Sequence, residues 1–189
     1  GDPETSALLS AETELALMLR FEAELAGAQA AHGLVPNEAA AAIAALCTSF
    51  SADLASLRTS TARDGVVVPE LVRQLKAALG APHARWLHLG CTSQDVIDTS
   101  LVLRLDRAIR LLDGRITSLL AGLDDLAAAW GDRRLMSRTR MRRALPITWS
   151  HKVAGWREPL VRHRCRFAEL RPRLLRLQLG GATGDRAEL

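Results

Sequence analysis

The chain has 189 residues, of which 48% are hydrophobic and 24% are charged, so it can bury the core of one domain or of two small ones. Aromatic residues make up only 4%, Tyr is absent, and Ala and Leu dominate, a composition that favours helix over strand. The sequence has no apolar run of the length that a membrane span needs, and its start, Gly1-Asp2-Pro3-Glu4, lacks the order of a signal peptide. Three widely spaced cysteines fit a reducing compartment better than a disulfide framework or a zinc site, so we predict a cytoplasmic protein.

The formal net charge of +4 hides an uneven distribution. Residues 1–70 carry an excess of acids, whereas residues 133–176 carry a large excess of basic residues, nearly all of them Arg. Such a basic half suits nucleic acid, a small polyanion or an acidic neighbouring subunit. Because these Arg residues lie largely in segments with apolar helical seams, we expect no nucleic-acid partner.

Helical spacing dominates the first part of the chain. Residues 10–31 predict an amphipathic helix that starts at Ser10 and stops near Gly33. A second helix is predicted from Pro36 to Leu57, and a third over Pro69–Leu79, where Pro suits a helix start. The first helix presents one stripe: Leu15, Met18, Leu19, Glu22, Leu25 and Ala26.

A much longer apolar stripe runs from Ile97 to Trp130 in steps of three and four residues. A helix of that length spans about 50 Å at 1.5 Å per residue. A small domain cannot cover it, so the pattern predicts a helix bundle made with other subunits.

Gly131 and Pro146 interrupt this pattern, and we predict a further helix with Pro146 as its first residue and Gly180-Gly181 at its end. Pro159 and Pro172 are expected to bend it, and His163 on its apolar seam is predicted to lie in the core. The expected fold is therefore all-α: a helical domain over residues 1–95, then bundle helices over residues 96–189.

The loop from His88 to Asp95 is the first candidate site. It places an imidazole, two hydroxyls, an amide and a carboxylate just before a helix, where free N–H groups attract anions. The competing interpretation is a simple helix cap made by Thr92, Ser93 or Asp95. His88, taken alone, is more often structural than catalytic.

The second candidate is the Arg-rich stretch from Ser137 to Pro146, which could clamp a multiply charged anion. The alternative is a solvated basic loop that pairs with the acidic N-terminal segment. A third stretch, Gly180 to Gly184, is rich in glycine but follows a helix rather than a strand, so it is a weak candidate for dinucleotide binding. The cysteines are best interpreted as small core residues.

Several motifs together resemble the fumarase/aspartase superfamily. The segment His88-Leu89-Gly90-Cys91-Thr92-Ser93-Gln94-Asp95-Val96-Ile97-Asp98-Thr99 is similar to the family's H-x-G-x-T-S-x-D-x-x-D-T, and Gln after Thr-Ser is typical of the 3-carboxy-cis,cis-muconate cycloisomerase branch. Arg138-Thr139 followed by Ala144-Leu145-Pro146-Ile147-Thr148, and the stretch from Arg162 to Gly184, resemble the same branch. The likeness extends over nearly the whole chain.

This resemblance implies a homotetramer whose central bundle is built from long helices, with sites shared between subunits. It implies interconversion of a 3-substituted cis,cis-muconate and its muconolactone in protocatechuate breakdown, without metal or organic cofactor. The substrate is a polyanionic small molecule, and neither nucleic acid nor membrane is an expected partner. Transition-state charge on a carboxylate would be stabilised by fixed donors.

The resemblance also assigns roles to individual residues. The implied catalytic residues are His88, Ser93 and Arg140, with the family's base-like Ser beyond the end of this chain. The implied substrate-binding residues are Thr92, Ser93, Gln94, Arg138, Thr139 and Arg143.

The chain departs from the family pattern in two ways. Arg140 replaces the family's His, and Arg142 and Arg143 replace polar residues. Arg cannot readily donate a proton at neutral pH, so a permanently ionised sulfonate in place of the substrate's 3-carboxylate is a further hypothesis. The chain also ends at Leu189, before the family's mobile loop, so these residues alone are not expected to form a complete site. The alternatives are another lyase of the superfamily, such as adenylosuccinate lyase, and a catalytically incomplete helical assembly protein.

Overall fold

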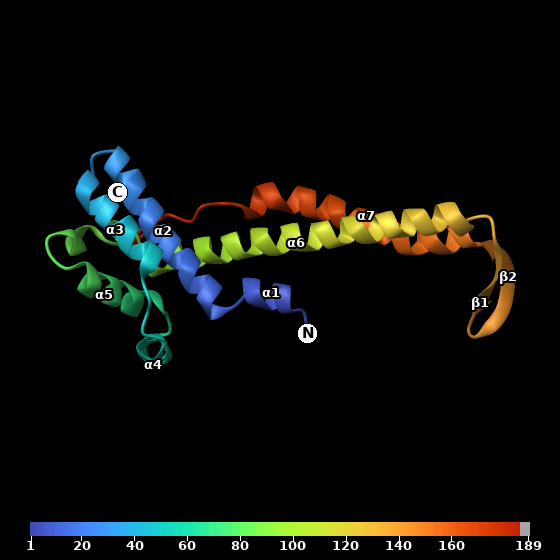
Figure 1. The fold of residues 1–189 in the computed structure, drawn as a ribbon, viewed down its shortest axis with the longest axis horizontal. Coiled ribbons are helices and arrows are strands. Elements are labelled where there is room, and N and C mark those ends of the chain that lie inside the picture. Colours follow the sequence, from blue (N-terminus) through green and yellow to red (C-terminus); the bar gives the residue numbers. More distant parts are fainter. Residues whose placement is uncertain (186–189) are drawn as a thin grey trace. The chain divides into compact units, whose positions relative to one another are not determined.

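The computed structural model describes residues 1–185, which divide into two compact units. Unit 1 comprises residues 1–105 and 175–185, and unit 2 comprises residues 106–174 (Figure 1). Helices dominate both, so the predicted all-α class is confirmed, with one small two-stranded sheet in the described residues. The domain boundary expected at residue 95 stays a prediction.

Unit 1 starts with a succession of helices whose ends follow local capping rules. Ser10 begins the second helix as predicted, because its Oγ accepts a hydrogen bond of 3.2 Å from the Thr13 N–H. Gly33, with φ +74°, follows the end of that helix. The elements are α1 (Pro3–Leu8), α2 (Ala11–Ala31), α3 (Asn37–Ser49), α4 (Leu54–Asp64), α5 (Val68–Leu79) and the 3-10 helix η1 (His83–Trp86).

The core of unit 1 forms where α2 lies along α3 and where α5 and η1 pack against α3. The predicted stripe of α2 faces this core, and Leu15 alone among its members is only partly buried. Glu22 is also on that stripe and is just 1% exposed, an acid among apolar neighbours. The largest fully buried apolar side chains of this core are Met18, Ile43, Leu71, Leu75, Leu87, Val68 and Val96.

The second predicted helix is wrong in its extent. The structure ends α3 at Ser49 and starts α4 at Leu54, instead of continuing one helix to Leu57. The reason is Asp53, whose Oδ1 accepts hydrogen bonds of 3.0 Å from the N–H groups of Ala55 and Ser56 and so caps a new helix. The apolar spacing continues across the break, so periodicity alone hid it.

Helix α6 (Ser93–Trp130) confirms the long predicted helix. In unit 1, its first turns bury Val96 and Ser100. Arg104 closes this contact by an ion pair of 2.8 Å between its Nη2 and Oε1 of Glu14 on α2. The start of α6 is therefore held firmly in the same unit as the loop that precedes it.

In unit 2, the remainder of α6 runs antiparallel to α7 (Trp149–Leu174). Three Arg residues of α7 at intervals of seven pair with Asp residues of α6 in reversed order, which fixes the register of the two helices. The pairs are Arg157–Asp124 at 2.6 Å, Arg164–Asp113 at 2.9 Å and Arg171–Asp106 at 2.8 Å.

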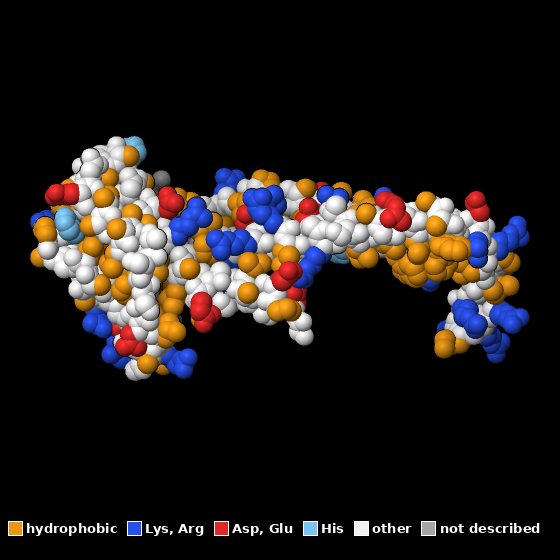
Figure 2. All heavy atoms as spheres, viewed as in Figure 1, with side chains coloured by type: hydrophobic (Ala, Val, Ile, Leu, Met, Phe, Trp, Pro, Cys, Tyr) orange, Lys and Arg blue, Asp and Glu red, His pale blue; other side chains and the backbone are white. Residues whose placement is uncertain are grey.

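Two helices cannot bury all the apolar residues that they carry. Leu112, Leu119, Trp130, Trp156 and Leu170 are all exposed within this chain, and hydrophobic side chains are visible on the surface (Figure 2). His163, predicted as a core residue, is likewise exposed. The prediction fails here because none of the described helices covers that side of α7.

The segment between α6 and α7 is a β-hairpin, not the predicted loop and helix start. Strand β1 (Arg134–Thr139) pairs antiparallel with β2 (Arg142–Thr148), and Pro146 lies in β2 opposite Met136. A two-stranded sheet tolerates Pro, since its missing N–H can face outward. Helix α7 instead begins after Thr148, whose Oγ1 accepts from the His151 N–H at 3.2 Å.

The end of α7 also differs from the prediction. The helix stops at Leu174 rather than near Gly180. It passes through Pro159 unbroken and ends shortly after Pro172. Residues 175–181 are therefore free to leave α7 and join unit 1.

None of the described helices is by itself long and apolar enough to cross a membrane, although α3 and α4, bent by 104°, pass that test as a pair.

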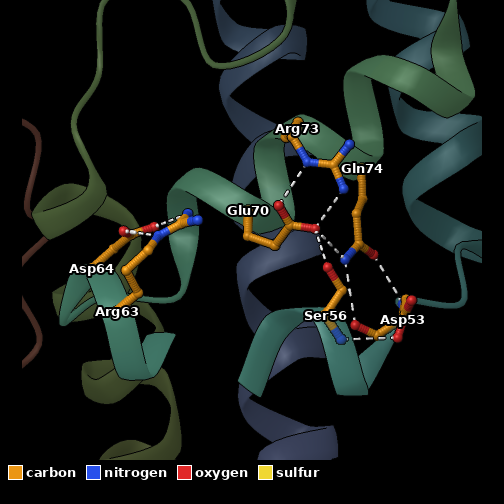
Figure 3. Close-up of polar contacts among 7 residues, drawn as sticks. All are labelled: Asp53, Ser56, Arg63, Asp64, Glu70, Arg73 and Gln74. Carbon is orange, nitrogen blue, oxygen red and sulfur yellow. Dashed lines mark hydrogen bonds and ion pairs between the residues drawn. The ribbon is translucent and has the colours of Figure 1, made fainter. Parts of the chain in front are cut away.

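A polar cluster fastens α4 to α5 on the surface of unit 1 (Figure 3). The Glu70 carboxylate accepts from Ser56 Oγ at 2.6 Å, from Gln74 Nε2 at 2.9 Å and from both Nε and Nη2 of Arg73 at 2.6 and 2.7 Å. These bonds, led by those from Arg73, lower the pKa of Glu70 well below its ordinary value of 4.5.

The three cysteines are free and differ in exposure. Cys47 is buried, as predicted, whereas Cys91 is half-buried and Cys165 is exposed on α7, which contradicts its prediction as a core residue. Burial, with a smaller contribution from the Glu22 charge, raises the pKa of Cys47 to about 11. Burial also raises the pKa of Cys91, helped by the charges of Glu22 and Asp95.

The Glu70 cluster predicts a pH-dependent stability. Because the folded pKa is lowered, its stabilisation is complete above pH 4.5 and is lost as the pH falls through the lowered value. Glu70→Gln is therefore expected to lower Tm near pH 7 and to match the wild type progressively better below pH 4.5. Calorimetry across that range checks this, with exposed Glu38→Gln as control; a pH-independent loss would contradict it.

The cysteines predict an order of alkylation. At pH 7.5, iodoacetamide is expected to modify Cys165 first, since thiolates react and the pKa values of Cys47 and Cys91 are raised. Peptide mass spectrometry over time gives the three rates. Equal rates for Cys91 and Cys165 in the folded chain would refute this order.

Candidate functional site

The loop from Leu87 to Thr92 joins η1 to α6 in unit 1. Two of its residues have left-handed backbone, His88 with φ +63° and Gly90 with φ +68°. Such a conformation is costly for a residue with a side chain. The contacts of the His88 ring therefore help to stabilise this conformation.

The His88 ring is held by a buried carboxylate. Its Nδ1 lies 2.6 Å from Oε1 of Glu22 on α2, and the Sγ of Cys91 lies 3.1 Å from the same nitrogen. The His88 side chain is 16% exposed, whereas that of Glu22 is 1% exposed. The contact joins residues from distant parts of the chain and connects the loop to the core.

Asp95, in the first turn of α6, holds the other end of the loop. Its buried carboxylate accepts from the Thr92 N–H at 3.0 Å, while the Asp95 N–H donates to the Thr92 carbonyl at 3.0 Å. This reciprocal pair is a helix cap, so the capping interpretation is correct for Asp95. The same carboxylate also accepts from the N–H groups of Gly180 and Gly181, at 2.8 and 3.0 Å.

The glycine-rich stretch thus packs on the candidate loop. A Cβ at Gly181, where φ is +68°, would lie 3.1 Å from the Gly90 carbonyl oxygen. Nearby, Gln178 exchanges hydrogen bonds with Thr99 Oγ1 at 3.2 and 3.3 Å. The two glycines therefore permit a close backbone approach, and nothing in this packing favours the dinucleotide interpretation.

Donor groups are left over at the start of α6. Among the described residues, neither the hydroxyls of Thr92 and Ser93 nor the backbone N–H groups of Ser93 and Gln94 have a hydrogen-bond partner. The Gln94 amide donates to Asp98 Oδ1 at 2.6 Å. Unpaired hydroxyls and N–H groups at a helix N-terminus are suited to a carboxylate.

The second predicted group of residues lies on the hairpin of unit 2. Arg138 is directly opposite Arg143 in the register, and Thr139 is opposite Arg142. Arg140 and Met141 form the turn, both with left-handed backbone at φ +43° and +65°. A register shift lies next to Ser137, whose hydroxyl bonds to both the N–H and the carbonyl of Leu145.

These arginines are exposed, and within the described residues none of them has an acidic partner. Like charges directly opposite on a hairpin repel each other. The Arg138–Arg143 pair is thus suited to an anion that neither strand supplies.

The structure places the predicted residues in two separate groups. His88, Thr92, Ser93 and Gln94 lie together in unit 1, whereas Arg138, Thr139, Arg140 and Arg143 lie together in unit 2. Glu22 was not predicted as a site residue. The sequence did hold one indication of its role, because an acidic residue on an otherwise apolar helical stripe needs a polar partner when it is buried.

A metal-ligand set was also not predicted. Within the described residues, Glu22, His88 and Cys91 offer ligand atoms that lie within 4.8 Å of one another. Tetrahedral zinc ligands at 2.0 Å from the metal are separated by about 3.3 Å, longer than the 2.6 Å between His88 and Glu22. The 2.6 Å distance is that of a hydrogen bond between the two side chains.

Comparison with known proteins gives these features a context. A family model described as lyase matches residues 4–189. The chain is 43% identical over 186 residues to the 3-carboxy-cis,cis-muconate cycloisomerase of Pseudomonas aeruginosa, covering 97% of this chain and 40% of that protein. It is 30% identical to the adenylosuccinate lyase of Archaeoglobus fulgidus, covering 99% of this chain and 41% of that protein.

A solved structure agrees with the sequence comparison. The 3-carboxy-cis,cis-muconate lactonizing enzyme from Pseudomonas putida superposes with a TM-score of 0.94 at 42% identity, over 99% of this chain and 43% of that one. The chain thus spans well under half the length of the relatives that it matches. By sequence and by fold, the chain belongs to the lyase family, the fumarase/aspartase superfamily that its motifs indicated.

Proposed function

We propose that this chain supplies two substrate-binding segments of a cycloisomerase that interconverts 3-carboxy-cis,cis-muconate and its muconolactone. The observation that carries the proposal is the 43% identity to a 3-carboxy-cis,cis-muconate cycloisomerase across 97% of the chain. The main alternative, adenylosuccinate lyase, has less support at 30% identity. A catalytically incomplete assembly protein would have no need of unpaired donors at the start of α6.

The first segment is the start of α6. Thr92, Ser93 and Gln94 would hold one substrate carboxylate through the unpaired hydroxyls and N–H groups, and His88 would orient it. In ring closure, an oxygen of one carboxylate bonds to one carbon of a conjugated C=C bond, and the electron pair of that bond moves into the carboxylate at its other end. The resulting enolate-like state ends when the second carbon takes up a proton. Fixed donors at the helix N-terminus would stabilise that state without reorganising.

The second segment is the hairpin. The directly opposed Arg138 and Arg143 would bind a second carboxylate, with Thr139 beside them and Arg140 at the turn. Arg140 would act by its charge, since a guanidinium keeps its proton. A 3-sulfonate in place of the 3-carboxylate is the variant substrate that such permanently charged groups would also suit.

We further propose a cytoplasmic homotetramer in which segments from different subunits complete each site. The exposed apolar residues of unit 2, such as Leu119 and Trp156, support an assembly that covers them. Three free cysteines support a reducing compartment.

A chimera tests the activity. This chain replaces the matching segment of the Pseudomonas aeruginosa cycloisomerase, which serves unaltered as the positive control. We expect the chimera to convert 3-carboxy-cis,cis-muconate, followed by ultraviolet absorbance, and the 189-residue chain alone to be inactive. Steady-state rates on the 3-sulfo analogue decide between the two substrates. A folded chimera that cleaves adenylosuccinate but leaves both muconates unchanged would overturn the proposal.

The hairpin provides a second prediction within the same chimera. Arg143→Gln removes a charged donor from the proposed carboxylate, so kcat/KM is expected to fall by about 10- to 100-fold. Arg134→Gln is the matched control, because Arg134 is exposed and lies opposite Thr148 at the other end of the hairpin. Equal losses in the two variants would show that only the net charge matters.

A further inference from the structure

Glu22 is the starting point, because it is an acid buried in the core of unit 1. It lies on the core-facing stripe of α2, 1% exposed, among apolar residues. One oxygen, Oε1, is 2.6 Å from His88 Nδ1, and the other, Oε2, is buried without a hydrogen-bond partner in the described residues. Burying a carboxylate with a single partner is costly, so the contact with His88 is the specific interaction that Glu22 makes.

The contact determines which nitrogen of His88 carries a proton. An ionised carboxylate only accepts hydrogen bonds, so the short distance requires a hydrogen on Nδ1. Cys91, also near Nδ1, does not compete as an anion, because burial and the charges of Glu22 and Asp95 raise the pKa of its thiol. The positive charge of Lys76 on α5 lowers the pKa of the same thiol, but its effect is smaller.

The second ring nitrogen is in a different position. In the described residues, Nε2 of His88 has no hydrogen-bond partner, and it is not among the fully buried unpartnered atoms. It therefore retains some solvent-accessible surface, on a side chain that is 16% exposed. The loop places this nitrogen a few residues before the unpaired donors of Thr92 and Ser93.

We propose that Glu22 is a positioning residue that keeps a proton on Nδ1 of His88 in both charge states of the ring. Nε2 is then the nitrogen that meets the substrate and at which a proton is gained or lost. This role rests on the proposed function, whereas the location of the proton does not. The left-handed backbone of His88 is the conformation in which the ring reaches Glu22.

Nitrogen NMR of the 189-residue chain, labelled with ¹⁵N-histidine, tests the proton location directly. The His88 signals are assigned with His88→Gln. We expect Nδ1 to keep the shift of a protonated nitrogen throughout a pH titration, while Nε2 changes to that of an unprotonated one. If Nε2 keeps the proton at high pH, Glu22 is the protonated partner and the proposal is wrong.

Variants of Glu22 test whether this residue causes the protonation of Nδ1 of His88. Glu22→Gln keeps an acceptor for the Nδ1 hydrogen and is expected to keep the tautomer, whereas Glu22→Met removes the acceptor and is expected to give a mixture of tautomers. Glu24→Met, at an exposed position on the same helix, is the control that leaves the His88 signals unchanged. If Glu22→Met does not fold, the spectra of the wild type and of Glu22→Gln still show which nitrogen of His88 carries the proton. An unchanged tautomer in folded Glu22→Met would overturn the proposal.

The catalytic consequence is measured in the chimera. Glu22→Met is expected to lower kcat by at least about tenfold, as loss of a partner that orients a ligating or reacting His does. Combined with His88→Gln it is expected to add nothing further, because the two residues act as a unit. If the chimera is inactive while the NMR result holds, the proposed function fails and the positioning stands. If it is active and Glu22→Met has no effect, the positioning role in catalysis fails.

Discussion

The arrangement of unit 1 depends on one buried carboxylate, that of Asp95. It caps α6 through the Thr92 N–H, and it binds the N–H groups of Gly180 and Gly181, which lie far along the chain. Since a buried carboxylate must be satisfied by donors, these three bonds constrain the loop and the returning segment together. The donors of Thr92 and Ser93 remain unpaired partly because Asp95, one turn into the helix, already makes the cap.

The charged side chains of the two units differ in how they are paired. The interior acids of unit 1, Glu22 and Asp95, each have assigned donors. In unit 2, the arginines of α7 that face α6 pair with Asp residues, whereas Arg138 and Arg143 on the hairpin oppose one another. The same residue type thus forms ion pairs between the two helices and lies without an acidic partner on the described hairpin, where we propose that it binds an anion.

Sequence patterns predicted the elements that depend on local rules. The helix that Ser10 caps, the helix that ends at Leu79 and the long stripe from Ile97 to Trp130 all follow from spacing and capping. The same rules failed at Asp53, where a cap interrupts an unbroken apolar period, and at the hairpin, where Pro146 was interpreted as a helix start. The motif from His88 to Asp95 identified the candidate site, but not Glu22, because the contact crosses most of unit 1 in sequence.

The sequence by itself determined the helical class, the long helix and the family, since these depend on periodicity and on motifs of neighbouring residues. Only the tertiary structure decided what each motif residue touches. Asp95 proved to be a clamp for Gly180 and Gly181, and His88 proved to have its Nδ1 against Glu22. The physical reason is that tertiary packing brings the partners of such a hydrogen bond together. Residues that are far apart along the chain do not form a periodic pattern from which their contact could be predicted.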